Sequence, residues 1–84
     1  MQTPALQLKV YDVLSGILGI PREQLTLDSS RKTIEEWDSL KHMYVMLALE
    51  EEFQIEFTDG EIASLDRVSA LVEALVAKTA GTAF

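Results

Sequence analysis

The sequence contains no cysteine. Disulfide bonds and thiolate metal sites are therefore excluded, and the composition fits a reducing compartment. No apolar run approaches the roughly 18 residues that a membrane span requires, and residues 1–20 do not combine a basic start with an apolar segment. From these absences we expect a cytoplasmic protein with neither a membrane span nor an export signal.

Basic residues are also scarce, with 7 Lys and Arg against 14 Asp and Glu, for a formal net charge of -7. This balance argues against a nucleic-acid partner, because phosphate backbones attract basic patches, and it favours basic protein partners. With 84 residues, of which 48% are hydrophobic, we expect a single small domain over residues 1–84.

Apolar residues recur at helical spacing near the start of the chain. The stripe comprises Leu6, Val10, Val13, Leu14, Ile17 and Leu18. It predicts a helix over 4–18, with Thr3 as the N-cap and Pro4 at the first helical position, where the missing N–H costs nothing. Gly19 at the C′ position and Pro21 beyond it end the helix.

Periodicity is lost between residues 19 and 37, which form a long connection. Residues 21–25 can form one helical turn that brings Leu25 onto the core, and we expect Ile34 and Trp37 to pin the rest. Connections of this length are uncommon in compact domains and are usually functional. The length of the connection therefore indicates a site nearby.

A second helix is predicted over 39–53, with Asp38 as its N-cap. Its apolar residues form two stripes, one of Val45, Met46, Leu49 and Phe53 and another of Leu40, Met43, Tyr44 and Leu47. A surface helix needs only one apolar stripe, the one that faces the core. Either the helix is central and buried on most sides, or the second stripe serves partners or a ligand.

Two further helices are predicted over 59–64 and 66–79. Thr58 and Glu61 form a capping box for the first, and Asp66 is a candidate N-cap for the second. The last helix has the apolar stripe Val68, Leu71, Val72, Leu75 and Val76. Lys78 suits its C-terminal dipole, and we expect the residues after Lys78 to fray. Residues 54–57 alternate like a strand but are too few to indicate one.

Ser39 lies in the first turn of the second predicted helix, where unpaired N–H groups and the helix dipole would stabilise an attached phosphate. Serine is also ordinary at such a position. A catalytic serine would need a base, and the sole histidine, His42, lies three residues along the same helix without an evident orienting partner. We therefore expect no catalytic residue and no metal site.

Three stretches together resemble the acyl carrier protein family. They are Trp37-Asp38-Ser39-Leu40, the run from Leu47 to Phe53 with its three consecutive glutamates, and the segment 55–59. The resemblance covers residues 10–78 and includes the helix order long, long, short, long. It implies an all-α, four-helix up-down bundle with a long loop after the first helix and a short third helix.

By this resemblance Ser39 receives 4′-phosphopantetheine from coenzyme A, with Asp38 and Leu40 beside it. The arm would hold acyl intermediates as thioesters in fatty-acid, polyketide or related biosynthesis, and the protein itself would be a monomeric, non-catalytic substrate of a phosphopantetheinyl transferase. An acyl-loading ligase or acyltransferase and downstream synthases or transferases with basic patches would be its partners. An aminoacyl or peptidyl carrier, or an unmodified acidic helical module, are the alternatives.

The resemblance also assigns a docking face for these partners. It consists of Leu40, Met43, Tyr44, Leu47, Glu50 and Glu51. The apolar residues would anchor a partner, and the carboxylates around them would steer its basic surface. The run 50–52 can also be a merely solvated charge cluster. Lys41 and His42 depart from the usual fatty-acid pattern, and this departure beside the arm indicates a discrete carrier of a specialised pathway.

Overall fold

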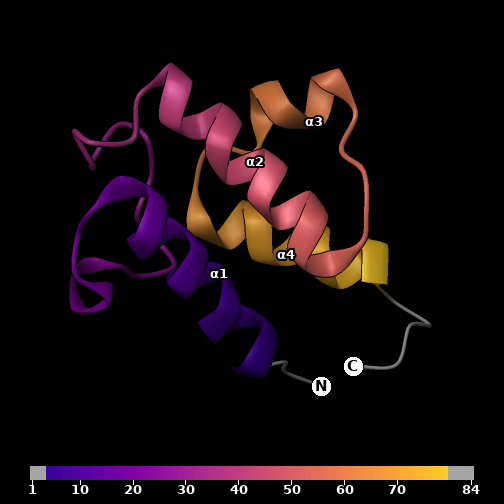
Figure 1. Ribbon diagram of the computed structural model, residues 1–84, viewed down its shortest axis with the longest axis horizontal. Coiled ribbons are helices and arrows are strands. Elements are labelled where there is room, and N and C mark those ends of the chain that lie inside the picture. The colour runs from indigo at the N-terminus through magenta and orange to yellow at the C-terminus, as the bar shows by residue number, and fades with distance from the viewer. Residues whose placement is uncertain (1–3, 80–84) are drawn as a thin grey trace.

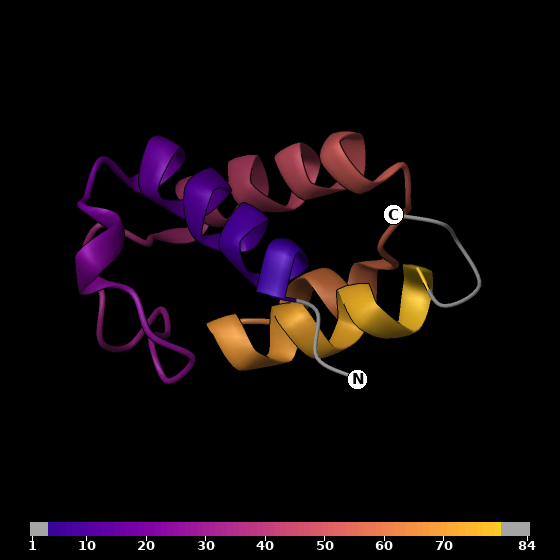
Figure 2. The same ribbon diagram turned by 90° about the horizontal axis from the view of Figure 1, so that it is seen from below.

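The computed structural model describes residues 4–79, which form four α-helices and one short 3-10 helix and no strand. In chain order these are α1 (Pro4–Leu18), η1 (Arg22–Gln24), α2 (Ser39–Phe53), α3 (Asp59–Ser64) and α4 (Val68–Thr79). Figures 1 and 2 show α2 and α4 on opposite sides of the molecule, with α1 inclined across them. The predicted all-α, four-helix bundle is confirmed.

The core lies between α1, α2 and α4. From these helices it takes Leu6, Val10, Leu14, Leu18, Val45, Met46, Leu49, Phe53, Val68, Leu71 and Leu75. Within each helix the buried residues recur at spacings of three or four, with Val45 and Met46 adjacent in α2, so they share one face. None of the helices within residues 4–79 is long and apolar enough to cross a membrane.

Helix α1 has the predicted bounds and the predicted end. Gly19 adopts φ +73°, a left-handed conformation that an L side chain rarely takes, and its N–H donates to Ser15 O over 2.9 Å. Val13 and Ile17 are partly buried at the edge of the core. Thr3, the predicted N-cap, lies outside the described residues.

The long connection between α1 and α2 is held at several points. Leu25 follows the turn η1 and is buried, as is Ile20, and Trp37 is 1% exposed. Ile34 packs against the core from its edge. The predictions that Leu25 joins the core and that Ile34 and Trp37 pin the loop are confirmed.

The start of α4 is fixed by this same connection. The N–H groups of Val68 and Ser69 donate to the carbonyls of Ser29 and Leu27 over 2.9 and 3.0 Å. The prediction that Asp66 caps this helix is wrong, because the helix begins two residues later and loop carbonyls take its first N–H groups. Residues 27–30 therefore depend on α4 for their position.

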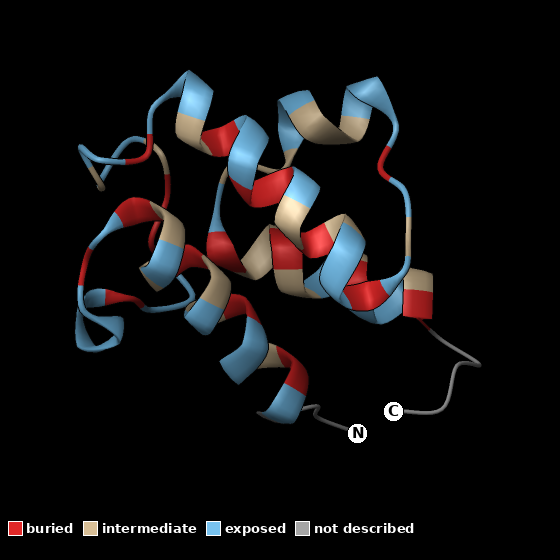
Figure 3. Cartoon of the chain, in the orientation of Figure 1, coloured by how far each residue is buried: buried red, intermediate tan, exposed pale blue. Residues whose placement is uncertain are grey.

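Helix α2 presents its two apolar stripes to different surroundings. Val45, Met46, Leu49 and Phe53 are buried, whereas Leu40, Met43, Tyr44 and Leu47 are exposed. Figure 3 shows exposed and buried residues alternating along α2 as its surface turns from solvent to core. The interpretation of α2 as a helix buried on most sides is therefore wrong. The second stripe is exposed, and the hypothesis that it serves partners or a ligand stays a prediction.

The capping box of α3 is present, and its glutamate also links this helix to α4 through an ion pair. Thr58 accepts from Glu61 N, Glu61 accepts from Thr58 N over 2.8 Å, and Glu61 also pairs with Lys78 over 2.9 Å. The hydrogen bond from Thr58 N, followed by that from Lys78, lowers the pKa of Glu61 below its ordinary value of 4.5. Lys78 also lies 5.6 Å from the centre of the Phe57 ring.

At the end of α4, two expectations need correction. Val76 is exposed and Val72 only partly buried, so the stripe is narrower than predicted. Thr79 is not frayed: it is buried and its hydroxyl donates to Leu75 O over 2.6 Å. Residues 80–84, for which fraying was also expected, lie outside the described part of the chain.

Candidate functional site at the start of helix α2

Ser39 is the first residue of α2 and is exposed. Asp38 adopts an extended conformation before it, and its Oδ1 accepts from Lys41 N over 2.8 Å, which confirms the predicted cap. The N–H groups of Ser39 and Leu40 have no acceptor among residues 4–79. Two free donors and the positive end of the helix dipole thus surround the serine hydroxyl.

Arg31 approaches the serine from the long connection. Its Nη2 donates to Ser39 Oγ over 3.0 Å, while its backbone N–H donates to Asp66 O over 3.0 Å. Ser30 and Arg67 form an isolated antiparallel bridge at the same point. Sequence reasoning missed Arg31, because nothing in the local pattern distinguishes it from the other basic residues.

An open hollow lies beside this hydroxyl, which leaves room for an attached group. It is lined by residues with charges of both signs and by two neutral ones, namely Arg31, Lys32, Glu35, Asp38, Asp66, Trp37 and Ser39. An exposed hydroxyl, free N–H groups and an arginine suit a phosphate ester, because each donor can bond to phosphate oxygens. The residues present therefore fit a phosphate-linked group on Ser39.

His42 faces away from this hollow and into the protein. It is 3% exposed, accepts from Trp37 Nε1 through Nδ1 over 3.1 Å, and lies 2.6 Å from Ile62 O through Nε2. Because indole N–H can only donate, Nδ1 must be unprotonated and Nε2–H must donate to the carbonyl.

The expectations for His42 therefore need correction. Its side chain is buried rather than exposed next to Ser39, and it has two defined partners, Trp37 and Ile62. With both ring nitrogens engaged in the interior, it is not available to Ser39 as a base. The burial of Trp37 confirms that this residue packs the loop. Lys41 remains partly exposed beside the site.

The exposed apolar stripe runs along α2 from this site. Leu40 is 60% exposed and Leu47 55%, with Met43 and Tyr44 between them. All four come from one helix, and residues three and four apart lie on the same side of it. Together they present a continuous apolar strip that begins next to Ser39.

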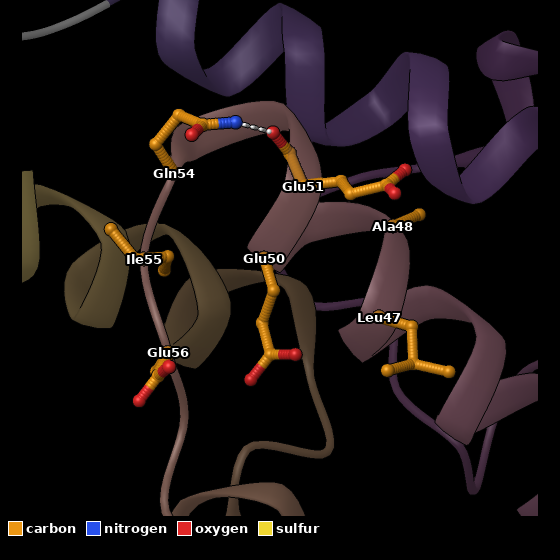
Figure 4. Close-up of a pocket in the computed structure, with 7 residues that line it drawn as sticks. All are labelled: Leu47, Ala48, Glu50, Glu51, Gln54, Ile55 and Glu56. Carbon is orange, nitrogen blue, oxygen red and sulfur yellow. Dashed lines mark hydrogen bonds between the residues drawn. The ribbon is translucent and has the colours of Figure 1, made fainter.

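Acidic residues follow this strip at the end of α2. A second open hollow is lined by Leu47, Ala48, Glu50, Glu51, Gln54, Ile55 and Glu56. Figure 4 shows the carboxylates of Glu50 and Glu51 pointing in different directions. Glu50 accepts from Phe57 N over 2.8 Å, so it also fixes the segment after α2, and Glu52 pairs with Lys9 over 3.0 Å. Glu51 is exposed.

Comparison with known proteins finds one matching family model and several proteins of similar sequence. A family model described as a phosphopantetheine attachment site matches residues 9–75. An acyl carrier protein from Cyanidium caldarium is 34% identical over 83% of this chain and 81% of its own length. An acyl carrier protein from Clostridium acetobutylicum is 35% identical over 84% of this chain and 92% of its own length. Another from Syntrophobacter fumaroxidans is 29% identical over 89% of this chain and 93% of its own length.

Proposed function

Since this chain belongs to the acyl carrier protein family, whose cofactor is covalently attached 4′-phosphopantetheine, we propose that Ser39 is the attachment residue. The observation that carries the proposal is an exposed hydroxyl at the first residue of a capped helix, next to two free N–H groups. In the modification, Ser39 Oγ attacks the β-phosphorus of coenzyme A, the phosphodiester forms, and adenosine 3′,5′-bisphosphate leaves as the hydroxyl proton is removed.

In the carrier function, the bound group supplies a thiol on which acyl intermediates are held as thioesters. The chain itself supplies position and recognition. Asp38 holds the first turn of α2 in place through Lys41 N, and Leu40 extends the apolar strip up to the attachment residue. We propose that the acyl cargo belongs to fatty-acid, polyketide or related biosynthesis.

The docking face of the proposal combines the apolar strip with the acidic end of α2. Leu40, Met43, Tyr44 and Leu47 would contact the partner, and Glu50 and Glu51 would steer its basic residues. The partners are a phosphopantetheinyl transferase, an acyl-loading ligase or acyltransferase, and downstream synthases or transferases. A carrier of this kind acts as a monomer, because each partner must reach the same face of α2.

Intact mass spectrometry tests the attachment. The purified protein is incubated with coenzyme A and a transferase of broad specificity, and the mass should rise by one phosphopantetheinyl group. Ser39→Ala should show no gain, whereas Ser64→Ala, which removes an exposed hydroxyl at the end of α3, should be modified like the wild type. No gain in the wild type, or a gain that survives Ser39→Ala, contradicts the proposal.

A second reading within the same class is an aminoacyl or peptidyl carrier, which would use the same arm. The relatives named above are acyl carrier proteins, which favours acyl cargo. The mass of the arm-bound species on protein isolated from its own cells distinguishes the two. An aminoacyl mass there would overturn the acyl assignment while leaving Ser39 as the attachment residue.

A further inference from the structure

We propose that Arg31 binds the phosphate of the phosphodiester on Ser39 and thereby fixes the root of the arm against the protein. This inference rests on the proposed function of Ser39 and adds a positioning residue to it. In the described structure the Arg31 guanidinium already lies at the serine hydroxyl, with Nη2 3.0 Å from Oγ.

Attachment of a phosphate changes what this guanidinium can bind. An ester oxygen accepts hydrogen bonds poorly, whereas the two non-bridging oxygens of a phosphodiester share a negative charge. Those oxygens are bonded to the phosphorus next to Oγ, so they fall within reach of the same guanidinium. Arginine binds phosphate through two parallel N–H donors, which a hydroxyl cannot match.

The guanidinium has an unused donor for this purpose. Arg31 Nε is buried and has no hydrogen-bond partner in the described structure, although buried N–H groups are nearly always paired. Nε and Nη2 can together form the bidentate fork that phosphate accepts. Free N–H groups on Ser39 and Leu40 offer further donors from the helix side.

The fold holds Arg31 at this place without the arm. Its backbone N–H is bonded to Asp66 O, and the Ser30–Arg67 bridge and the bond from Val68 N to Ser29 O fix the adjoining residues. The cation is thus positioned by the contact between the long connection and the start of α4. Little ordering is then required when the phosphate arrives, which favours binding.

Several negative charges around the hollow would oppose an attached phosphate unless a cation lies nearby. Glu35, Asp38 and Asp66 line it and would repel a phosphate, and the chain carries a formal net charge of -7. Arg31 and Lys32 are the cations in the same lining. Of the two, only Arg31 donates to Ser39, so Arg31 is the residue placed to bind the phosphate, and Lys32 provides a matched control.

The first test compares apo and holo protein for each variant. Attachment of the arm should raise the folding equilibrium constant of the wild type, by about tenfold for one charge-assisted hydrogen bond. Arg31→Gln should lose most of that gain and Arg31→Lys part of it, while Lys32→Gln should keep it. Each variant is compared with its own apo form, so any effect of the substitution on folding itself cancels.

A second test needs only the wild type, so it stands even if a variant folds or is modified poorly. The Arg31 Nε–H resonance in a ¹H–¹⁵N spectrum should move downfield on conversion to holo protein and exchange more slowly with water. An unchanged resonance, an equal holo gain in Arg31→Gln, or an equal loss in Lys32→Gln overturns the role of Arg31. If the wild type acquires no arm on Ser39, the proposed function itself fails instead.

Discussion

Replacing His42 with alanine should destabilise the protein by about 3 kcal/mol. The side chain joins three parts of the molecule, since it lies on α2, accepts from the indole of Trp37 and donates to Ile62 O on α3. Removal leaves the Trp37 N–H without a partner in a site that is 1% exposed. The segment just before Asp38 and Ser39 then loses a tether to α2.

The magnitude follows from the two hydrogen bonds. An unsatisfied buried donor costs about 1–3 kcal/mol, and the second bond, to a partly exposed carbonyl, contributes about 0.5–1.5 kcal/mol. Their central values sum to about 3 kcal/mol. An 84-residue domain has a total stability of about 4–12 kcal/mol, so the variant should remain folded at 25 °C.

Urea unfolding followed by tryptophan fluorescence measures this loss, because Trp37 is the single tryptophan of the chain. With a slope of about 1 kcal/mol per M, the midpoint should fall by about 3 M. His42→Gln is the matched control. Its amide can accept from the indole and donate to the carbonyl, so it should lose less.

A double-mutant cycle with Trp37→Phe isolates the indole bond. All four proteins of the cycle are unfolded in urea and followed by far-ultraviolet circular dichroism, because the Trp37→Phe variants contain no tryptophan. In the phenylalanine background His42→Ala should cost about 1–2 kcal/mol less than in the wild type, because no donor is left unpaired. An equal cost in both backgrounds would show that the bond between the two rings does not stabilise the fold. A loss below about 1 kcal/mol in the wild type would refute the argument altogether.

Two further predictions concern acidic residues. Glu51→Lys should weaken binding to the phosphopantetheinyl transferase, and its difference in affinity from the wild type should be smaller at high salt. Glu36→Lys, on the exposed loop, is the control and should bind with nearly the affinity of the wild type. Calorimetric titration measures these affinities, and equal affinities of Glu51→Lys and the wild type would show that docking is not electrostatic. Folding lowers the pKa of Glu61. The stability that its carboxylate contributes to the fold should therefore be complete at a pH well above 4.5, and it should be lost as the pH falls through the folded-state pKa. The stability advantage of the wild type over Glu61→Gln, measured from urea midpoints, should therefore shrink on acidification, and an advantage independent of pH would contradict the assignment.

Local signals in the sequence determined most of the helical framework. Asp38, Gly19 and the Thr58–Glu61 capping box each satisfy backbone groups within one turn of their own position, and the structure confirms all three. The spacing of apolar residues likewise divides α2 into two stripes, although the structure was needed to show that one of them is exposed. Such features involve neighbours in the chain, so residue order alone is enough to predict them.

The tertiary structure decided the contacts between residues far apart. The connection between α1 and α2 closes onto the start of α4, and this closure fixes the first residue of α4 and brings Arg31 to Ser39. The partners of His42 likewise come from two other segments, Trp37 in the connection and Ile62 on α3. No periodicity records that closure, because it results from hydrogen bonds between segments whose relative placement is set only when the core packs. The sequence by itself thus predicted the helix α2 and the candidate serine at its start. Only the fold placed Arg31 beside Ser39 and turned His42 into the interior.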